Sequence, residues 1–111
     1  MAIENSNRPD ASAIVLNWNT RDLLLNCLRS IVRGSGRLDI EIIVVDNGSV
    51  DGSPESVEKL FPRVRLIRNE SNHGFARANN AGIGISSGKY LCLINSDVVV
   101  AESCIPAMFD Y

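Results

Sequence analysis

The chain has 111 residues, of which 45% are hydrophobic, and carries a net charge of -2 with an isoelectric point near 5.3. This length and apolar content suffice for one domain with a buried core and exclude a wholly disordered chain. The acidic balance argues against an electrostatic nucleic-acid binder, which would carry a basic face, so we expect no nucleic-acid partner.

The termini and cysteines set the expected domain and compartment. Residues 1–11 are polar and predict a flexible leader before a single folded unit over residues 12–111. Cys27, Cys92 and Cys104 match no zinc or Cys-x-x-Cys spacing, and reduced thiols favour a cytoplasmic location. No apolar run approaches the roughly 20 residues of a membrane span, so we expect none in this chain.

Four short apolar runs alternate with three segments of helical periodicity. The runs predict strands at residues 13–17, 40–45, 64–68 and 89–94. The third strand contains Arg65 and Arg68, which favours a position at the edge of a sheet. The fourth strand, Lys89 to Ile94, is predicted to be buried.

The helical segments are defined by their caps and apolar stripes. Thr20 is expected to cap the first helix, Ser53-Pro54 to begin the second, and Gly88 to end a third over residues 74–87. Glycines in the third helix are expected to permit close packing on the sheet. The residues predicted to face the core are Leu24, Leu28, Ile31 and Val32, then Val57, Leu60 and Phe61, then Phe75, Ala78, Gly82 and Ile85.

The resulting βαβαβαβ order predicts an α/β fold of four mainly parallel strands with helices on both faces. Ligands of such sheets bind beyond the carboxyl ends of the strands. Polar clusters follow three of the strands, so parallel pairing would bring them together at one rim. These clusters are Asn17-Trp18-Asn19, Asp46-Asn47-Gly48-Ser49 and Asn95-Ser96-Asp97.

Taken one by one, these polar residues have two readings each. Asn95 and Asp97 could supply oxygen ligands to Mg²⁺ or Mn²⁺, or could form a plain turn. Asp46 could accept hydrogen bonds from a base or ribose, or from its own turn. Asp51 is more typical of a residue that organises a loop or helix start than of a ligand contact. Arg77 could reach a phosphate or remain solvated.

The ordered motifs together are more specific than any one. Asn17-Trp18-Asn19, residues 44–53 (VVDNGSVDGS), residues 72–82 (NHGFARANNAG), Gly88-Lys89-Tyr90 and Asn95-Ser96-Asp97 resemble the family 2 glycosyltransferases. The likeness covers about residues 12–105 and is similar to the rhamnosyltransferase-like branch that acts on bacterial surface polysaccharides. It implies a Rossmann-like GT-A fold, of which the chain would form the nucleotide-binding half.

The resemblance also implies roles for individual residues. Asp97 matches the last acid of the DxD motif and is the implied metal ligand, with Mg²⁺ or Mn²⁺ as cofactor. Asn47 and Asn95 stand where acids are often found. The residues implied to bind the nucleotide sugar are Asn17, Asn19, Asp46, Asn47, Asp51, Arg77, Asn80 and Asn95. The catalytic base is expected in an acceptor-binding half beyond this chain, so we name none.

The expected activity is an inverting transfer of a sugar from a UDP-, dTDP- or GDP-linked donor to a glycan or lipid-linked acceptor. The whole protein would be cytoplasmic or peripheral to the inner membrane, and the fragment alone weakly active or inactive.

An alternative is a non-catalytic nucleotide- or protein-binding module. A nucleotidyltransferase is disfavoured, because Asn17-Trp18-Asn19-Thr20 lacks a glycine- and lysine-rich loop. An uncovered sheet edge or face would also favour homo-oligomers.

Overall fold

The structure, a computed structural model, describes residues 8–99. Strands and helices alternate along the chain, as the sequence predicts. They are β1 (Ala11–Asn17), α1 (Arg21–Gly34), β2 (Ile40–Asp46), α2 (Ser53–Leu60), β3 (Arg65–Arg68), α3 (Phe75–Ile85) and β4 (Tyr90–Asn95).

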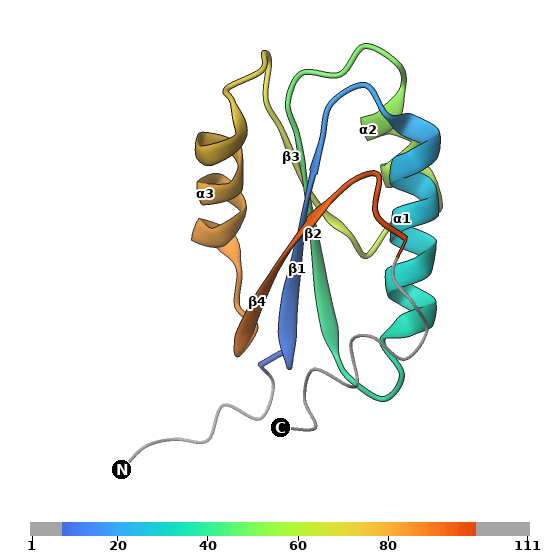
Figure 1. Cartoon of the computed structure of the whole chain (residues 1–111), viewed down its shortest axis with the longest axis vertical. Coiled ribbons are helices and arrows are strands. Elements are labelled where there is room, and N and C mark those ends of the chain that lie inside the picture. The colour runs from blue at the N-terminus through green and yellow to red at the C-terminus, as the bar shows by residue number, and fades with distance from the viewer. Residues whose placement is uncertain (1–7, 100–111) are drawn as a thin grey trace.

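The four strands form one parallel sheet in the order β3-β2-β1-β4. Figure 1 shows α3 on one face of this sheet and α1 with α2 on the other. The predicted fold class is therefore confirmed, as is the edge position of β3. The chain reverses direction between successive strands through helices, which is the connection that parallel pairing requires.

Each face of the sheet has its own apolar core. Under α1 and α2 the buried residues include Val15, Leu28 and Val44, and under α3 they include Ile14 and Val45. The central strands β1 and β2 are buried on both faces, which explains their continuous apolar runs. Gly82 brings α3 close to the sheet, because a Cβ there would lie 2.6 Å from Ile14 Cγ2. The expected close packing through a small residue is thus confirmed.

The prediction of a buried β4 was wrong. Leu91 and Leu93 are about half exposed and Tyr90 is 66% exposed. The strand is at the second edge of the sheet, and α3 packs chiefly on β1 and β2. An apolar run indicates which residues could be buried, but whether they are buried depends on which other elements pack against them.

Three helical side chains predicted to be buried are also exposed: Val32 and Leu60 by about half and Phe75 by 62%. In α1 both Leu25 and Cys27 are buried, whereas Val32 lies in the last turn of the helix and is exposed. Leu60 is the last residue of α2 and Phe75 is the first residue of α3, so each lies at an end of its helix.

The folded unit begins before residue 12. Ala11 is the first residue of β1, the Asp10 amide donates to the Asp39 carbonyl at 2.8 Å, and the Arg8 guanidinium donates to the carbonyls of Ser87 and Gly88. Residues 8–11 of the predicted leader therefore belong to the fold, while residues 1–7 lie outside the described part of the chain.

Candidate functional site

The parallel register brings the polar strand ends to one rim, at the top of Figure 1. Asn17 is paired with Asp46, Asp46 with Arg68, and Leu16 with Asn95. The predicted convergence of the three clusters is therefore confirmed. The rim contains two kinds of residue, which differ in burial and in hydrogen bonding.

At the centre of the rim, Asn17 and Asp46 form a buried polar pair. Asn17 is fully buried and Asp46 is 2% exposed. The Asn17 Nδ2 amide donates to Asp46 Oδ1 at 2.9 Å, and Asp46 Oδ2 accepts the Ser49 backbone amide at 2.8 Å. The Ser49 hydroxyl also donates to Asp46 Oδ1 at 2.7 Å. Asp46 thus organises its own turn, with three of about four acceptor positions used.

Asn47 fastens the loop that leads into α3. Its Oδ1 accepts Asn69 Nδ2 at 3.1 Å and the His73 amide at 3.2 Å. Its Nδ2 donates to Asn72 Oδ1 at 3.2 Å and to the Gly74 carbonyl at 3.4 Å. The side chain is only 2% exposed. A carboxylate could not make the two donations, which gives a physical reason for Asn rather than an acid at this position.

Asp51 holds the first turns of two helices. Its Oδ2 accepts the Arg21 amide at the start of α1 at 2.9 Å, and its Oδ1 accepts the Ser53 amide at the start of α2 at 3.0 Å. The Ser53 hydroxyl donates to the same oxygen. Burial alone would raise the pKa of Asp51, but these bonds from Ser53 and Arg21 hold it below its usual value. The reading of Asp51 as a loop organiser is thus supported.

Thr20 is the N-cap residue of α1, as predicted, but its side chain makes no capping hydrogen bond. The Thr20 hydroxyl instead donates to Asn17 Oδ1 at 2.7 Å and lies 2.8 Å from the Ser96 hydroxyl, which joins the ends of β1 and β4. Asn19 joins the loops after β1 and β2. Its Oδ1 accepts the Val50 amide at 2.8 Å, and its own φ is 51°.

A second set of rim residues is exposed. Arg77, Asn80, Asn95 and Asp97 are all open to solvent. Within residues 8–99, none of their side chains makes a hydrogen bond or ion pair. Arg77 lies in the first turn of α3, which has no side-chain cap and no acid, so its amide groups favour an anion.

Asp97 is close enough to α1 to affect Cys27. Burial and the Asp97 charge together raise the pKa of the Cys27 thiol to about 11. Among the described residues, no group of three His, Cys, Asp or Glu could hold a metal ion. Asp97 and Asn95 offer hard oxygen donors, which fit a Mg²⁺ or Mn²⁺ that completes its coordination with phosphate and water.

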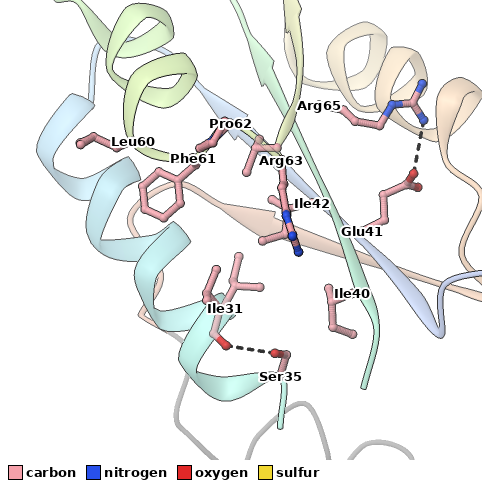
Figure 2. Close-up of a pocket in the computed structure, with 12 residues that line it drawn as sticks. Ile31, Ser35, Ile40, Glu41, Ile42, Leu60, Phe61, Pro62, Arg63 and Arg65 are labelled. Atoms are coloured by element: carbon pink, nitrogen blue, oxygen red, sulfur yellow. Dashed lines mark hydrogen bonds and ion pairs between the residues drawn. The ribbon is translucent and has the colours of Figure 1, made fainter. Parts of the chain in front are cut away.

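Two cavities open at the rim. One of about 290 Å³ is lined by Asp46, Ser49, Val50 and Arg68 among others, and one of about 380 Å³ by residues 19–23 and Asp51. A larger cavity of about 620 Å³ lies at the other end of the sheet, between the ends of α1 and α2. Figure 2 shows Ile31, Ile42 and Phe61 around it.

This larger cavity was not predicted, although Val32 and Leu60 line it and were noted as apolar stripe residues. Its walls are mainly aliphatic and aromatic, and Glu41 points to the opposite face, toward Ser12 and Ser87. It lies away from the polar strand ends, so the rim is the better candidate for polar ligand chemistry.

Comparison with known proteins decides the family. The model of the family described as "Glycosyl transferase family 2" matches residues 12–111. The chain belongs to glycosyltransferase family 2. Among its relatives are Glycosyltransferase GlyG of Streptococcus pneumoniae, 35% identical over 88% of this chain, and Succinoglycan biosynthesis protein ExoO of Rhizobium meliloti, 33% identical over 92%.

Solved structures agree on the fold. S. aureus TarS residues 1–349 match 89% of this chain with a TM-score of 0.80 at 21% identity. The mannosyltransferase PcManGT of Pyrobaculum calidifontis, in complex with GDP-Man and Mn²⁺, matches 87% with a TM-score of 0.75 at 26% identity. This chain therefore has the GT-A type of Rossmann-like fold.

The family 2 chain spans about a third of the length of these proteins: 33% of GlyG, 29% of ExoO, 31% of the TarS chain and 30% of PcManGT. No helix within residues 8–99 has the length and apolar character to cross a membrane.

Proposed function

We propose that this chain forms the donor-binding part of an inverting glycosyltransferase, which transfers a sugar from a nucleotide diphosphate sugar to a glycan or lipid-linked acceptor. The observation that carries the proposal is the exposed side of the rim. There Asp97, Asn95, Arg77 and Asn80 carry uncommitted polar side chains beside an uncapped helix start. Family membership supplies the reaction class.

The two sides of the rim suit different parts of the donor. The 290 Å³ cavity beside Asp46 would take the nucleoside, with the remaining acceptor position of Asp46 available to a base or ribose. Asn19 and Asp51 would position the loop around it. The first turn of α3 with Arg77 would hold the diphosphate, because its amides and guanidinium favour negative charge. Asn80 would border the same groups.

Asp97 and Asn95 would hold a divalent cation, Mg²⁺ or Mn²⁺. When bound, the ion would neutralise negative charge that develops on the departing diphosphate. An acceptor hydroxyl would attack the anomeric carbon on the side opposite the diphosphate and give up its proton to a base. We assign no base among residues 8–99.

Two solved relatives suggest the candidate donors, and the cysteines suggest the compartment. PcManGT was solved with GDP-Man and Mn²⁺, and TarS with UDP and UDP-GlcNAc, so UDP, GDP and dTDP are the nucleotides to test. Cys27 is a free, buried thiol, which favours the reducing cytoplasm. The rhamnosyltransferase-like branch stays a prediction from the sequence.

Calorimetric titration tests the proposal. We expect one of UDP, GDP or dTDP to bind in the presence of Mn²⁺, and Asp97→Ala to weaken this binding at least about tenfold, since one of few ligands is lost. Asp39→Ala, an exposed acid at the amino end of β2, is the matched control and should bind normally.

Two outcomes would contradict the proposal. If none of the three nucleotides binds with or without Mn²⁺, the chain is a protein-binding module that retains the fold. If Mn²⁺-dependent binding survives Asp97→Ala unchanged, Asp97 is not the metal ligand and the metal site lies elsewhere on the rim.

A further inference from the structure

A chain of side-chain hydrogen bonds crosses the rim from the end of β2 to the turn after β4. Asp46 Oδ1 accepts the Asn17 Nδ2 amide at 2.9 Å, and Asn17 Oδ1 accepts the Thr20 hydroxyl at 2.7 Å. The Thr20 hydroxyl oxygen also lies 2.8 Å from that of Ser96. Asn17, Asp46 and Ser96 are buried, so these bonds are largely shielded from water. Thr20 thus links the buried side of the rim to the turn that contains Asp97.

The direction of each bond follows from the chemistry of the groups. The carboxylate of Asp46 accepts, and the amide and hydroxyl of Ser49 donate to it as well. The side-chain nitrogen of Asn17 therefore faces Asp46, and its oxygen faces Thr20. Because the hydroxyl of Thr20 has one proton and donates it to Asn17, the Ser96 hydroxyl must donate to Thr20. Thr20 is therefore the acceptor that fixes Ser96.

Ser96 and Asp97 are the two central residues of the turn that follows β4. The Val98 amide closes this turn by donating to the Asn95 carbonyl at 3.1 Å. Ser96 faces inward and is 8% exposed, whereas Asp97 is open to solvent. The Asn95 carbonyl also accepts a bond from Cys27 Sγ at 3.8 Å, which is weak because a thiol is a poor donor. The position of Asp97 therefore depends on the hydrogen bond that its neighbour Ser96 makes.

We propose that Thr20 is a positioning residue for the divalent cation of the donor site, because it holds Ser96 and thereby the carboxylate of Asp97. This inference rests on the proposed function, in which Asp97 and Asn95 bind Mg²⁺ or Mn²⁺. Such a cation needs its oxygen ligands in a defined geometry, so a turn that is less firmly held binds it less tightly. Thr20 acts through Ser96 and is not itself a metal ligand.

The alternative is that Thr20 only stabilises the fold, because it supplies the hydrogen-bond partner of the buried Asn17 oxygen. Loss of that bond would lower the free energy of unfolding, but the folded molecules would keep their affinity for the metal. Metal-dependent binding under native conditions therefore separates the two roles, and urea denaturation measures the structural one.

Calorimetric titration of the 111-residue chain with UDP, GDP and dTDP, each with excess Mn²⁺ and again with EDTA, tests the positioning role. We expect Thr20→Val, which keeps the shape of the side chain and removes the hydroxyl, to raise the Kd with Mn²⁺ at least about fivefold. The Kd with EDTA should change less than about twofold, since the nucleotide pocket itself is intact. Circular dichroism checks that the variant is folded.

Three further variants make the result specific. Thr20→Ser keeps the hydroxyl and should bind within about twofold of wild type. Ser96→Ala removes the same bond, so combining it with Thr20→Val should weaken binding no further. It also carries the test if Thr20→Val does not fold. Ser86→Ala is the matched control and should bind as wild type, because its similarly half-buried hydroxyl donates to the Ile83 carbonyl at 2.7 Å at the other end of α3.

Asp97→Ala, measured in parallel, separates this inference from the proposed function. If Asp97→Ala weakens Mn²⁺-dependent binding and Thr20→Val does not, the positioning role is wrong and the proposed function stands. A loss in Thr20→Val that is equally large with EDTA would overturn the positioning role too, as would additive losses in the combined Thr20→Val and Ser96→Ala variant. If Asp97→Ala binds as wild type, or no nucleotide binds, both proposals fail.

Discussion

The two sides of the rim use polar residues in different ways. After β1 and β2, Asn17, Asp46 and Asn47 are almost fully buried and bond to one another or to nearby loops. After β4 and at the start of α3, Asp97 and Arg77 are exposed and make no side-chain bond within residues 8–99. The first side has the character of a scaffold, and the second has side chains available to a ligand.

This difference divides residues that the sequence grouped together. Substitutions in the scaffold side should lower the free energy of unfolding, because buried groups lose their partners. Substitutions on the exposed side should change ligand affinity and leave stability within about 0.5 kcal/mol. Urea denaturation measures the first kind of effect and calorimetry of ligand binding measures the second.

The largest expected effect is that of Asn47→Ala. It removes four hydrogen bonds around a buried amide and leaves the Asn69 amide and His73 N–H without their acceptor. At about 1 kcal/mol for each bond, the free energy of unfolding should fall by about 3–4 kcal/mol, measured by urea denaturation. Asn80→Ala, on the exposed side, is the control. Equal stabilities of the two variants would contradict the division of the rim.

Asp51→Ala should have the next largest effect, since the first backbone amides of α1 and α2 both lose the side-chain oxygen that accepts their hydrogen bonds. A lost cap costs about 1 kcal/mol, so urea denaturation should show a loss of about 2 kcal/mol. Asp22→Ala, in the first turn of α1 with a side chain 84% exposed, is the control and should cost less. A loss as small as that of the control would show that Asp51 is not the cap.

The stabilising role of Asp51 also has a pH dependence. Folding lowers the pKa of Asp51 below its ordinary value of about 3.8, so its contribution to the free energy of unfolding is fully present above pH 3.8. The contribution is lost as the pH falls through the lower folded pKa. The pKa of Glu41 is lowered as well, so wild type alone would mix two contributions. The test is therefore the difference in the free energy of unfolding between wild type and Asp51→Asn, which should narrow below pH 3.8. A constant difference would contradict the assignment.

The smallest effect is that of Arg77→Ala, which should weaken binding of a nucleotide diphosphate about fivefold in calorimetry. An exposed charge near a phosphate contributes modestly, because water and salt screen it. Unfolding should be unchanged, since Arg77 makes no side-chain bond among the described residues. Arg63→Ala, at the opposite end of the sheet, is the control. A loss of stability in Arg77→Ala would place it in the scaffold.

The sequence predicted the order of elements, the parallel sheet and the convergence of polar strand ends, because these depend on local periodicity and on connection rules. It did not predict that the side chain of Asp51, and not that of the N-cap residue Thr20, accepts the first amide of α1, since this bond joins residues 30 positions apart in the chain. Nor could it separate Asn47 from Asn80, both Asn in family motifs. Their difference arises from burial by loops that fold over one and not the other.

A local sequence pattern also cannot show whether another part of the molecule buries an apolar segment. The apolar run of β1 is buried by α1 and α3, whereas the similar run of β4 extends beyond α3 at the edge of the sheet. Val32 and Leu60 continue apolar stripes into an open cavity for the same reason. Periodicity identifies the face of an element, and tertiary arrangement decides how far along it burial extends.

The most direct test of the account is to map bound Mn²⁺ by its paramagnetic broadening of backbone amide resonances, in the presence of the nucleotide diphosphate that binds. We expect the strongest broadening around Asn95–Asp97 and the first turn of α3, and weak broadening at Ile31 and Arg63 at the other end of the sheet. Strongest broadening around the cavity between α1 and α2, or around Glu55 and Glu58, would contradict it.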